Sequence, residues 1–511
     1  MRRGYGAFVV VALAGALVAC SSAAMPEADI DSTTEALVAP ELEKYYEQTL
    51  DWESCGGRVE CADLLVPLDY GEPDQGDLEI AVARYPATGD RQGALVFNPG
   101  GPGGSGTEFA QYANTTVSPD ILRAYDFVGF DPRGVGDSDP IDCLTNQDTD
   151  EVLAAAADPQ TDAEIEQYIN DAEKIAAGCQ QRSPDLLGYV DSASVVNDMD
   201  ILRSALGEQD LDYLGKSYGT KLGAMYADRF PSVTGRMVLD GALPPDLDGA
   251  SISLGQAESF ENTLRRYVEW CQSREDCSLS SDSVDAGVTE IQEFFTGLDG
   301  QPLVVGDREL TEGLAMQAVL YYLYFPFAGD WASLNRGLGD AFRGDGSTLL
   351  SMLDQRLERD TAGNYKNNGN SYDAFLAITC LDDGSDLSVA ELSERAKDWE
   401  AVAPTFGPAL SWSELVCTEW PVPAKERPKA SKAAGAGPIL VVSTTHDPAT
   451  PVVWAEKLAT DLADSRLVVV DADGHTAYGN GSSCIDRTVD EFLLDGVLPE
   501  SDLTCDDGWE F

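Results

Sequence analysis

Short runs of consecutive apolar residues recur along the chain, and most are bounded by Gly, Pro or Asp. Runs of this kind are typical of strands that are buried on both faces of a parallel sheet. The first two runs, ADLLVPLDY and LEIAVARYPA, predict an opening antiparallel pair. The six runs that follow predict further strands at residues 93–99, 125–131, 211–217, 235–241, 438–444 and 466–472.

Helix-like stretches lie between several of these predicted strands, for example at residues 198–207 and 220–230. Alternation of strands and helices favours a mostly parallel sheet that is covered by helices on both faces. We therefore expect an α/β fold built on a mostly parallel, eight-stranded sheet.

The alternation stops between residues 246 and 435, where the chain reads as a series of helices. This segment follows the sixth predicted strand, so it would lie over the carboxyl ends of the strands, where open α/β sheets bind ligands. We expect a mainly helical cap there, and the alternative is a separate domain with no part in the site. The core is then split into 51–245 and 436–511, on either side of a cap at 246–435.

The amino-terminal residues have the pattern of an export signal. Two arginines precede a short apolar stretch at residues 7–19, which is too short to span a membrane comfortably. The stretch ends in Leu-Val-Ala before Cys20, which resembles a bacterial lipobox; ordinary signal cleavage with an incidental cysteine is the alternative. We expect a signal peptide at 1–19 and a lipidated Cys20 that begins a tether at 20–50. The protein would then be a cell-surface lipoprotein on the outer face of the cytoplasmic membrane, or a shed or secreted form of it.

Acidic residues outnumber basic ones by 89 to 33, which gives a formal net charge of -56. Such a surface repels phosphate, so nucleic acid is excluded as a partner. One interpretation is that this charge keeps an exported protein soluble. The other is that acidic residues around the entrance to the site attract cationic substrates. No C-x-x-C pair or histidine cluster points to a metal, and we expect no cofactor.

The cysteine count agrees with export. The chain has 11 cysteines, and setting Cys20 aside leaves an even number, which predicts disulfides in an exported protein. These cysteines allow many connectivities, and closeness in the sequence is the only guide to their pairing. It favours Cys55–Cys61, Cys143–Cys179, Cys271–Cys277, Cys380–Cys417 and Cys484–Cys505.

The segment Gly215-Lys216-Ser217-Tyr218-Gly219 matches the pattern G-x-S-x-G. A predicted strand precedes it and a helix-like run follows, which is the setting of a nucleophile elbow, a sharp turn that needs small residues at both flanks. The turn would expose the Ser217 hydroxyl at the sheet edge and aim the Tyr218 backbone N–H at a developing oxyanion. A simple Gly-rich turn is the alternative. The elbow predicts the α/β-hydrolase fold with Ser217 as nucleophile.

A serine nucleophile needs a base, and the chain has two histidines, His446 and His475. In the α/β-hydrolase fold the order along the chain is serine, acid, histidine, which Ser217, Asp447 and His475 satisfy. His446 as base would leave His475 idle, so we expect His475 to be the general base and Asp447 the acid that orients it. Asp471, Asp473 and many other acids of the chain compete with Asp447 for this role.

The loop after the third predicted strand, at residues 98–106, is rich in glycine and reads NPGGPGGSG. Clustered glycines let backbone N–H groups approach a substrate without interference from Cβ atoms. We expect this loop to complete the oxyanion hole, with Gly101 as the preferred donor and Gly100 as the second choice; a merely flexible loop is the alternative. The segment at 131–138, DPRGVGDS, is expected to brace the loop.

Taken together, NPGGPGGSG, DFVGFDPRGVGDS, YLGKSYGTKLGAMYADRFP, MVLDG, THDPATP and GHT resemble secreted bacterial tripeptidyl aminopeptidases. These are relatives of prolyl aminopeptidase among the α/β-hydrolase serine peptidases. The resemblance covers the core at about 50–245 and 435–511, and the cap more loosely, through its position and CLDD. Prolyl aminopeptidases usually carry His-Gly-Gly-Pro-Gly in the oxyanion loop, whereas Asn98-Pro99 precedes the glycines here, which fits the tripeptidyl branch better.

The resemblance implies a serine exopeptidase that releases short peptides, often tripeptides, from a free N-terminus. Such enzymes need an anionic subsite for the substrate ammonium, and Asp382 and Asp383 in the cap are the candidates. An esterase on the same scaffold is the nearest alternative. A non-catalytic surface lipoprotein that binds peptides is a third, which the presence of all three triad residues disfavours. The expected partners are peptide substrates, with the membrane reached only through the lipid anchor.

Overall fold

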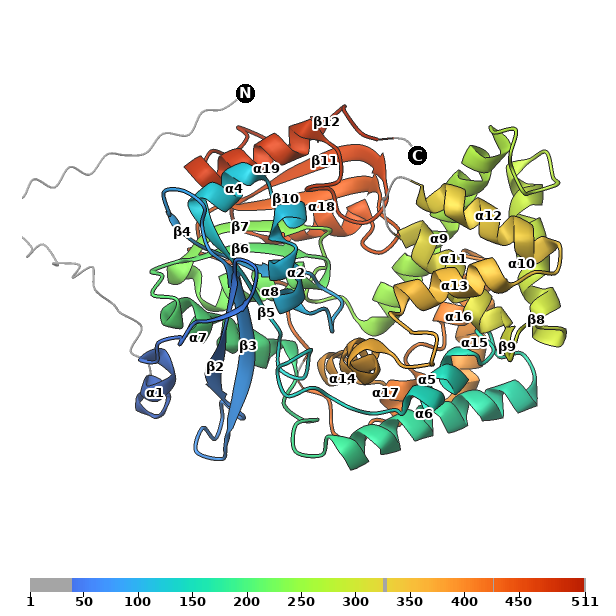
Figure 1. Cartoon of the computed structure of the whole chain (residues 1–511), viewed down its shortest axis with the longest axis horizontal. Coiled ribbons are helices and arrows are strands. Elements are labelled where there is room, and N and C mark those ends of the chain that lie inside the picture. The colour runs from blue at the N-terminus through green and yellow to red at the C-terminus, as the bar shows by residue number, and fades with distance from the viewer. Residues whose placement is uncertain (1–38, 325–328, 426, 510–511) are drawn as a thin grey trace, which may run out of the picture. The chain divides into compact units, whose positions relative to one another are not determined.

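The computed structural model describes residues 39–324, 329–425 and 427–509 of the chain (Figure 1). Glu41–Phe511 form one compact unit. The expected signal peptide and the expected lipidation site at Cys20 lie outside the described residues. Among the described helices, none combines the length and the hydropathy that crossing a bilayer requires.

A single ten-stranded sheet forms the core, in the order β1-β2-β3-β5-β4-β6-β7-β10-β11-β12. The first three pairs in this order are antiparallel, and every pair from β5–β4 onward is parallel. The eight predicted strands are all present, and two short edge strands, β1 and β12, are added to them. The bounds are β1 Glu53–Gly56, β2 Val59–Pro67, β3 Asp77–Tyr85, β4 Gly93–Asn98, β5 Tyr125–Phe130, β6 Leu211–Lys216, β7 Thr234–Asp240, β10 Ile439–His446, β11 Ser465–Asp473 and β12 Leu503–Cys505.

Helices cover both faces of the sheet, which explains why its central strands are apolar at consecutive positions. In β4, Leu95 and Phe97 pack into the cluster of buried side chains on one face, while Ala94 and Val96 pack into the cluster on the other. Both faces thus exclude water, as a parallel sheet requires. The first face is covered by α2 Gly106–Gln111, α3 Ala113–Thr116, α4 Pro119–Ala124 and α19 Ser483–Asp495, and the second by α7 Ser192–Ala205, α8 Tyr218–Arg229 and α18 Val452–Asp461.

The segment between β7 and β10 is the expected mainly helical insertion after the sixth predicted strand, and it has an apolar cluster of its own. Tyr267, Ile291 and Leu334 belong to that cluster and are fully buried. One small antiparallel hairpin, β8 Leu303–Val305 with β9 Arg308–Leu310, is part of the insertion. Its helices are α9 Gly249–Gln272, α10 Val284–Gly300, α11 Glu312–Tyr324, α12 Asp330–Phe342, α13 Ser347–Arg356, α14 Asn370–Asp382, α15 Val389–Glu400, α16 Gly407–Leu410 and α17 Leu415–Thr418.

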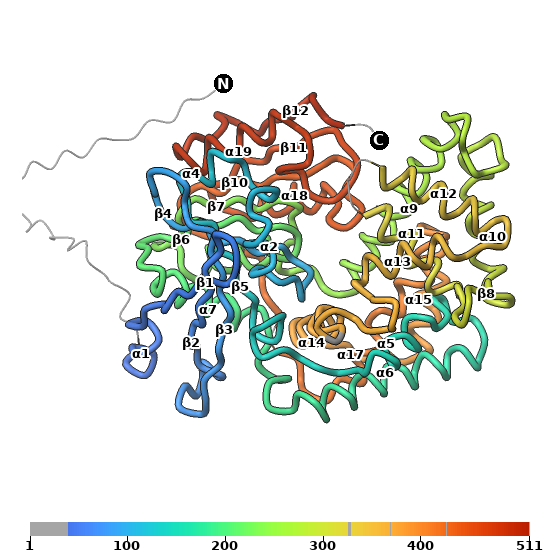
Figure 2. Tube along the Cα trace, in the orientation of Figure 1, coloured from blue at the N-terminus to red at the C-terminus, as the bar shows by residue number. Residues whose placement is uncertain are grey.

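A second excursion from the core, which the sequence pattern did not indicate, packs with this insertion. It contains α5 (Asn146–Leu153) and α6 (Asp162–Arg182), between β5 and α7. Figure 1 shows α6 beside α17, and the Leu153 carbonyl accepts a hydrogen bond from the Gln317 side chain of α11 over 3.0 Å. Figure 2 traces both excursions away from the sheet. The cap is therefore assembled from two stretches of chain rather than one.

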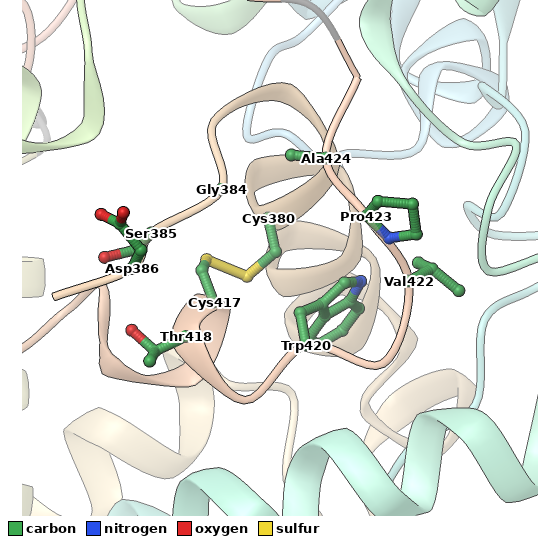
Figure 3. Close-up of a pocket in the computed structure, with 10 residues that line it drawn as sticks. All are labelled: Cys380, Gly384, Ser385, Asp386, Cys417, Thr418, Trp420, Val422, Pro423 and Ala424. Carbon is green, nitrogen blue, oxygen red and sulfur yellow. A yellow bond between two sulfur atoms is a disulfide. The ribbon is translucent and has the colours of Figure 1, made fainter. Parts of the chain in front are cut away.

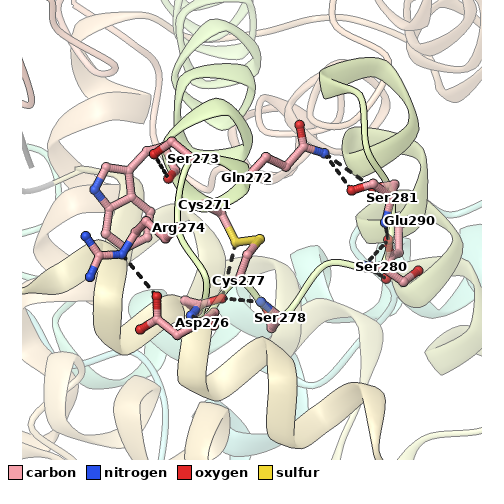
Figure 4. The surroundings of a disulfide bond; sticks show 12 residues. Cys271, Gln272, Ser273, Arg274, Asp276, Cys277, Ser278, Ser280, Ser281 and Glu290 are labelled. Carbon is pink, nitrogen blue, oxygen red and sulfur yellow. Dashed lines mark hydrogen bonds and ion pairs between the residues drawn. A yellow bond between two sulfur atoms is a disulfide. The ribbon is translucent and has the colours of Figure 1, made fainter.

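Five disulfides join the cysteine pairs that closeness in the sequence favoured. Cys271–Cys277 closes the turn that follows α9 (Figure 4). There the Asn335 side chain of α12 accepts a hydrogen bond from the Ser278 N–H over 2.7 Å. Cys380–Cys417 ties α14 to α17 within the cap. Each of these two bridges thus fixes a local contact within the cap.

Candidate active site

Ser217 lies at the sharp turn between β6 and α8, with φ 56° and ψ -126°. A positive φ at a residue with a side chain is strained, and strain at this position is typical of a nucleophile elbow. A Cβ on Gly219 would lie 2.7 Å from the Asn98 carbonyl oxygen, and a Cβ on Gly215 would collide with the Gly219 carbonyl. Only glycine fits at either flank, which accounts for the G-x-S-x-G spacing.

The imidazole of His475 is paired with the carboxylate of Asp447. Nδ1 of His475 lies 2.9 Å from both Oδ1 and Oδ2 of Asp447, and the two side chains are almost completely buried. The Asp447 carboxylate also accepts the N–H groups of Ala449 and Thr450, at 2.9 and 2.8 Å, and the Thr450 hydroxyl at 3.0 Å. An acceptor-only carboxylate at Nδ1 selects the tautomer with its proton there, which leaves Nε2 free to take a proton.

The loop that carries His475 is fixed by Asp240, the last residue of β7. Its carboxylate accepts the N–H groups of Ala477 at 2.8 Å and Tyr478 at 3.0 Å. Lys216, the residue before the serine, donates from Nζ to the Tyr478 carbonyl over 2.7 Å. Burial raises the pKa of Asp240, while the charge of Lys216 and the two N–H donors act to lower it. Sequence reasoning missed this brace, and its only signal was an acid at the carboxyl end of a buried strand.

A tyrosine of the cap contacts His475 through both its ring and its backbone. Tyr324 is the last residue of α11, and its ring centroid lies 4.7 Å from that of His475. The His475 backbone N–H donates to the Tyr324 carbonyl over 3.0 Å. The cap therefore contacts His475 through Tyr324, which sequence reasoning did not single out.

The loop after β4 packs directly against the elbow. A Cβ on Gly100, which has φ +99°, would lie 2.6 Å from the Lys216 carbonyl oxygen and 2.7 Å from the Ser217 Cβ. The Gly100 N–H donates to the Asn98 side chain over 2.9 Å, so it is engaged within the loop. This engagement favours Gly101 over Gly100 as the loop's oxyanion donor, alongside the Tyr218 N–H at the start of α8.

Asp131, directly after β5, braces the oxyanion loop in the way that the sequence suggested. Its carboxylate accepts the Ser105 hydroxyl at 2.7 Å and the Thr107 N–H at 3.0 Å, both at the end of the loop. It also accepts the Asp137 N–H at 3.0 Å, which closes its own turn. Burial raises the pKa of Asp131, and these hydrogen bonds act to lower it.

Asp382 and Asp383, the expected ammonium subsite, are engaged by partners within the chain. The buried Asp382 carboxylate accepts from Lys221 Nζ and the Ser192 N–H, at 2.7 and 2.9 Å, and also from the Ser192 hydroxyl. Asp383 is paired with the Arg427 guanidinium. Figure 3 shows a pocket at Gly384, the residue that follows them in the chain. Cys380, Cys417 and Trp420 also line this pocket, and Ser217, Asp447 and His475 do not. These contacts disfavour the two acids as the subsite, because they connect α14 with α8, α7 and the end of the cap.

The competing histidine and acids lie outside the pair formed by His475 and Asp447. His446 Nε2 lies 3.5 Å from Asp471, and burial, followed by the charge of Arg266, lowers the pKa of His446. Asp473 is paired with the Arg266 guanidinium at 2.9 Å. These contacts leave Asp447 as the acid that orients His475 in this structure.

Among the described residues, Cys484, Cys505 and Asp507 form a cluster of the kind that could hold a metal ion. The two cysteines are joined in a disulfide. The Asp507 carboxylate accepts the Ser482 and Ser483 hydroxyls, which lower its pKa to about 2. The carboxylate thus supplies negative charge at the start of α19, where the helix dipole favours it, and the cluster does not suit a metal.

Comparison with known proteins agrees with this geometry. A family model described as "TAP-like protein" matches residues 403–505. The chain is similar to serine protease Hip1 of Mycobacterium tuberculosis, with 35% identity over 90% of this chain and 91% of the relative. It is 34% identical to a tripeptidyl aminopeptidase of Streptomyces lividans, over 89% and 86% of the two chains. It is also 37% identical to a protein named Carboxylesterase B of Mycobacterium tuberculosis, over 87% and 86%.

Proposed function

The chain belongs to the α/β-hydrolase family that includes serine protease Hip1 and the tripeptidyl aminopeptidases, and on this premise we propose the residues that perform its hydrolysis. The observation that carries the proposal is the arrangement at the sheet edge. Ser217 occupies a strained elbow whose N–H donates to the Asp240 carbonyl, the Asp240 carboxylate fixes the loop that carries His475, and Asp447 accepts from the His475 imidazole. A nucleophile, a base and an orienting acid are the parts that acyl transfer needs.

In the proposed reaction the Ser217 oxygen attacks the peptide carbonyl while His475 Nε2 takes the serine proton. Asp447 stabilises the imidazolium that forms. The backbone N–H groups of Tyr218 and Gly101 bind the negative oxygen of the tetrahedral intermediate. His475 then gives its proton to the leaving amine, and water, activated by the same histidine, hydrolyses the acyl-enzyme.

The proposed substrates are peptides with a free N-terminus, from which the enzyme releases short fragments, tripeptides foremost. A relative named tripeptidyl aminopeptidase supports this specificity. The burial of the nucleophile supports it as well, because Ser217 is only 8% exposed, which favours a chain end over the middle of a folded protein. The acidic composition suits a cationic N-terminus.

Ester hydrolysis is the second candidate, because one relative of 37% identity is named Carboxylesterase B. The same nucleophile and oxyanion donors serve either acyl group, so the two functions differ in the substrate that the cap admits. Chromogenic tripeptide amides with free and with blocked N-termini, compared with short acyl esters, separate them. We expect the free tripeptide to have the highest kcat/KM. Equal turnover of blocked peptides would contradict exopeptidase action, and a preference for esters would favour the second candidate.

Ser217→Ala tests the nucleophile. The substitution removes the attacking oxygen, so we expect the rate of amide hydrolysis to fall by about 10⁴-fold or more. Ser347→Ala, on the exposed start of α13, is the matched control and should retain full activity. Activity of the Ser217 variant near that of the control would end the assignment.

We also propose that the protein is exported and held on the outer face of the cytoplasmic membrane by a lipid on Cys20. The support is the arginine-led apolar stretch that ends at this cysteine. Cys20→Ala should move the protein from the membrane fraction to the soluble fraction in its host, as immunoblotting of the two fractions would measure. Retention of the variant in the membrane fraction would contradict the anchor.

A further inference from the structure

A series of buried hydrogen bonds joins the cap helix α14 to Tyr218, the residue that follows the nucleophile. The Tyr218 hydroxyl lies 2.6 Å from Oγ of Ser192, the first residue of α7. Ser192 Oγ in turn donates to the carboxylate of Asp382, the last residue of α14. The three side chains are at most 6% exposed, so the series lies in an interior where hydrogen bonds are strong.

The charge of Asp382 gives this series a single direction. A serine hydroxyl has one proton, and Ser192 donates it to the Asp382 carboxylate, which can only accept. The other bond must therefore be donated by the Tyr218 hydroxyl to Ser192 Oγ. Burial, followed by the charge of Asp382, raises the pKa of Tyr218 well above its usual value, so the phenol keeps the proton that it donates.

Asp382 is itself held in place from both the core and the cap. From the core, Lys221 Nζ and the Ser192 N–H donate to its carboxylate at 2.7 and 2.9 Å. From the cap, the disulfide Cys380–Cys417 ties the last turn of α14 to α17 (Figure 3). The far end of the series is thus fixed, as a contact that positions another residue requires.

The near end of the series lies at the proposed oxyanion hole. The backbone N–H of Tyr218 is one of the two proposed donors, and a Cβ on Gly100 of the oxyanion loop would lie 3.1 Å from the Tyr218 nitrogen. The first turn of α14 borders the same loop, because a Cβ on Gly103 would collide with the Ser371 carbonyl oxygen. One cap helix is therefore joined to both halves of the hole, to the loop at its start and to Tyr218 through its last residue.

We propose that Asp382 and Ser192 are positioning residues for the oxyanion hole: through the Tyr218 hydroxyl they hold the Tyr218 N–H where the negative oxygen of the tetrahedral intermediate forms. The inference rests on the proposed function of Ser217 and of the Tyr218 N–H. An oxyanion donor is effective when its direction is fixed before the reaction. A tyrosine anchored at its hydroxyl as well as at its backbone has less freedom to turn.

The size of the effect is limited by the bond that transmits it. Loss of one oxyanion donor altogether lowers kcat of a serine protease by about 10²- to 10³-fold. One hydrogen bond between two hydroxyls can hold the donor in place by no more than its own net contribution, a factor of about 2 to 10. We therefore expect the smaller factor when the series is cut, because the N–H itself remains.

Two substitutions cut the series and leave the pair of Asp382 with Lys221 intact. Ser192→Ala removes the hydroxyl in the middle, and Tyr218→Phe removes the phenol hydroxyl while its ring stays. Asp382→Ala is less suitable, because it leaves the Lys221 ammonium buried without its partner, which is strongly destabilising.

The test compares a ligand that places charge in the oxyanion hole with one that does not, using the full-length protein. A tripeptide trifluoromethyl ketone accepts the Ser217 oxygen at its carbonyl carbon and becomes a tetrahedral oxyanion, whereas the matching tripeptide alcohol has no carbonyl. For both variants we expect the inhibition constant of the ketone to rise, and kcat for a tripeptide amide to fall, by about 2- to 10-fold. The inhibition constant of the alcohol should stay the same. The double variant should lose no more than the larger single loss, because both substitutions remove the same bond.

Tyr226→Phe is the matched control, since it removes from the same helix a buried phenol hydroxyl, one that donates to Asp200 over 2.9 Å. It should match the unsubstituted chain in every assay. Ketone affinity and kcat of Ser192→Ala or Tyr218→Phe equal to those of the control would overturn the positioning role. Equal weakening of ketone and alcohol would overturn it as well, by indicating a general disturbance of the site. An unsubstituted chain that neither hydrolyses the amide nor binds the ketone would overturn the proposed function itself, which is a distinguishable result.

Discussion

Asp447, the proposed orienting acid, accepts several hydrogen bonds besides the one from His475. Besides His475, its carboxylate accepts the backbone N–H groups of Ala449, Thr450 and Thr476, and the Thr450 hydroxyl. The Thr450 hydroxyl also lies 3.2 Å from His475 Nδ1. These donors hold the carboxylate in one orientation, so the imidazole that it binds is also held in one orientation.

Asp447→Asn should keep this geometry but change the tautomer of the His475 imidazole. The amide nitrogen can donate to Nδ1 of His475, which moves the imidazole proton to Nε2 and prevents it from accepting the Ser217 proton. We expect kcat for a tripeptide amide to fall by about 10⁴-fold. Asp471→Asn, which changes the acid beside His446, is the control and should retain activity. A small loss for Asp447→Asn, or a comparable loss for the control, would move the role to another acid.

Among single residues, the sequence indicated those that we propose to carry the chemistry and missed those that pack against them. Ser217 and His475 stood out because G-x-S-x-G has a structural setting and because histidine is scarce. Tyr324 did not, since the apolar stretch around it indicates a helix and nothing more. Its contact with His475 depends on how the cap folds back over the sheet, which no local pattern encodes. The partner of Asp382 was hidden for a related reason, because Lys221 lies far away in the sequence.

Among the elements, α14 links the cap to the core through buried carboxylates at both of its ends. Near its start, Asp373 accepts the N–H groups of Cys143 and Leu144 at 2.7 and 3.4 Å. At its end, Asp382 is paired with Lys221 of α8, the helix that begins at the nucleophile elbow. The cap is thus joined to α8, which begins at the elbow, through Asp382, and Asp373 joins α14 to the segment that precedes α5.

Asp373 should make stability depend on pH. Burial raises its pKa from 3.8 to about 7, against the two N–H donors, which act to lower it. The folded state therefore keeps a proton that the unfolded chain releases, so the stabilising contribution is present below about pH 4 and is lost as pH rises to about 7. Within this window the free energy of unfolding should fall by on the order of 1 kcal/mol per pH unit from this group.

Asp373→Asn keeps an acceptor oxygen and removes the titration. Urea unfolding between pH 4 and 8 should show a shallower pH dependence for this variant than for the unsubstituted chain. Asp386→Asn, at an exposed position after the same helix, should leave the dependence unchanged. An identical pH dependence in all three proteins would show that the Asp373 carboxyl titrates near its ordinary value.

Strands and helices differ in how well a sequence pattern predicts them. The eight predicted strands are present because each is long enough, and buried enough, to leave a continuous apolar run. The edge strands β1 and β12 have four and three residues and leave no such run. The excursion of α5 and α6 was missed because its burial comes from partners that are distant in the chain, such as Gln317, 164 residues from Leu153.

In the molecule as a whole, some of the acidic residues have a structural role in the interior, which the net charge alone does not reveal. Several aspartates are buried and accept backbone N–H groups at the places that shape the site, at Asp131, Asp240, Asp382 and Asp447. A buried carboxylate is tolerated only when donors surround it. Part of the excess of 89 acids over 33 basic residues is therefore built into the interior of the fold.

The disulfides have a consequence for the biogenesis of the protein. Their partners are separated by 6, 36, 6, 37 and 21 residues, and the five intervals follow one another without overlap or nesting. Each cysteine can therefore form its disulfide as soon as a short length of polypeptide has emerged into an oxidising compartment. Oxidation can proceed in the order of synthesis, and none of these ten cysteines has to wait unpaired for a distant part of the chain to arrive.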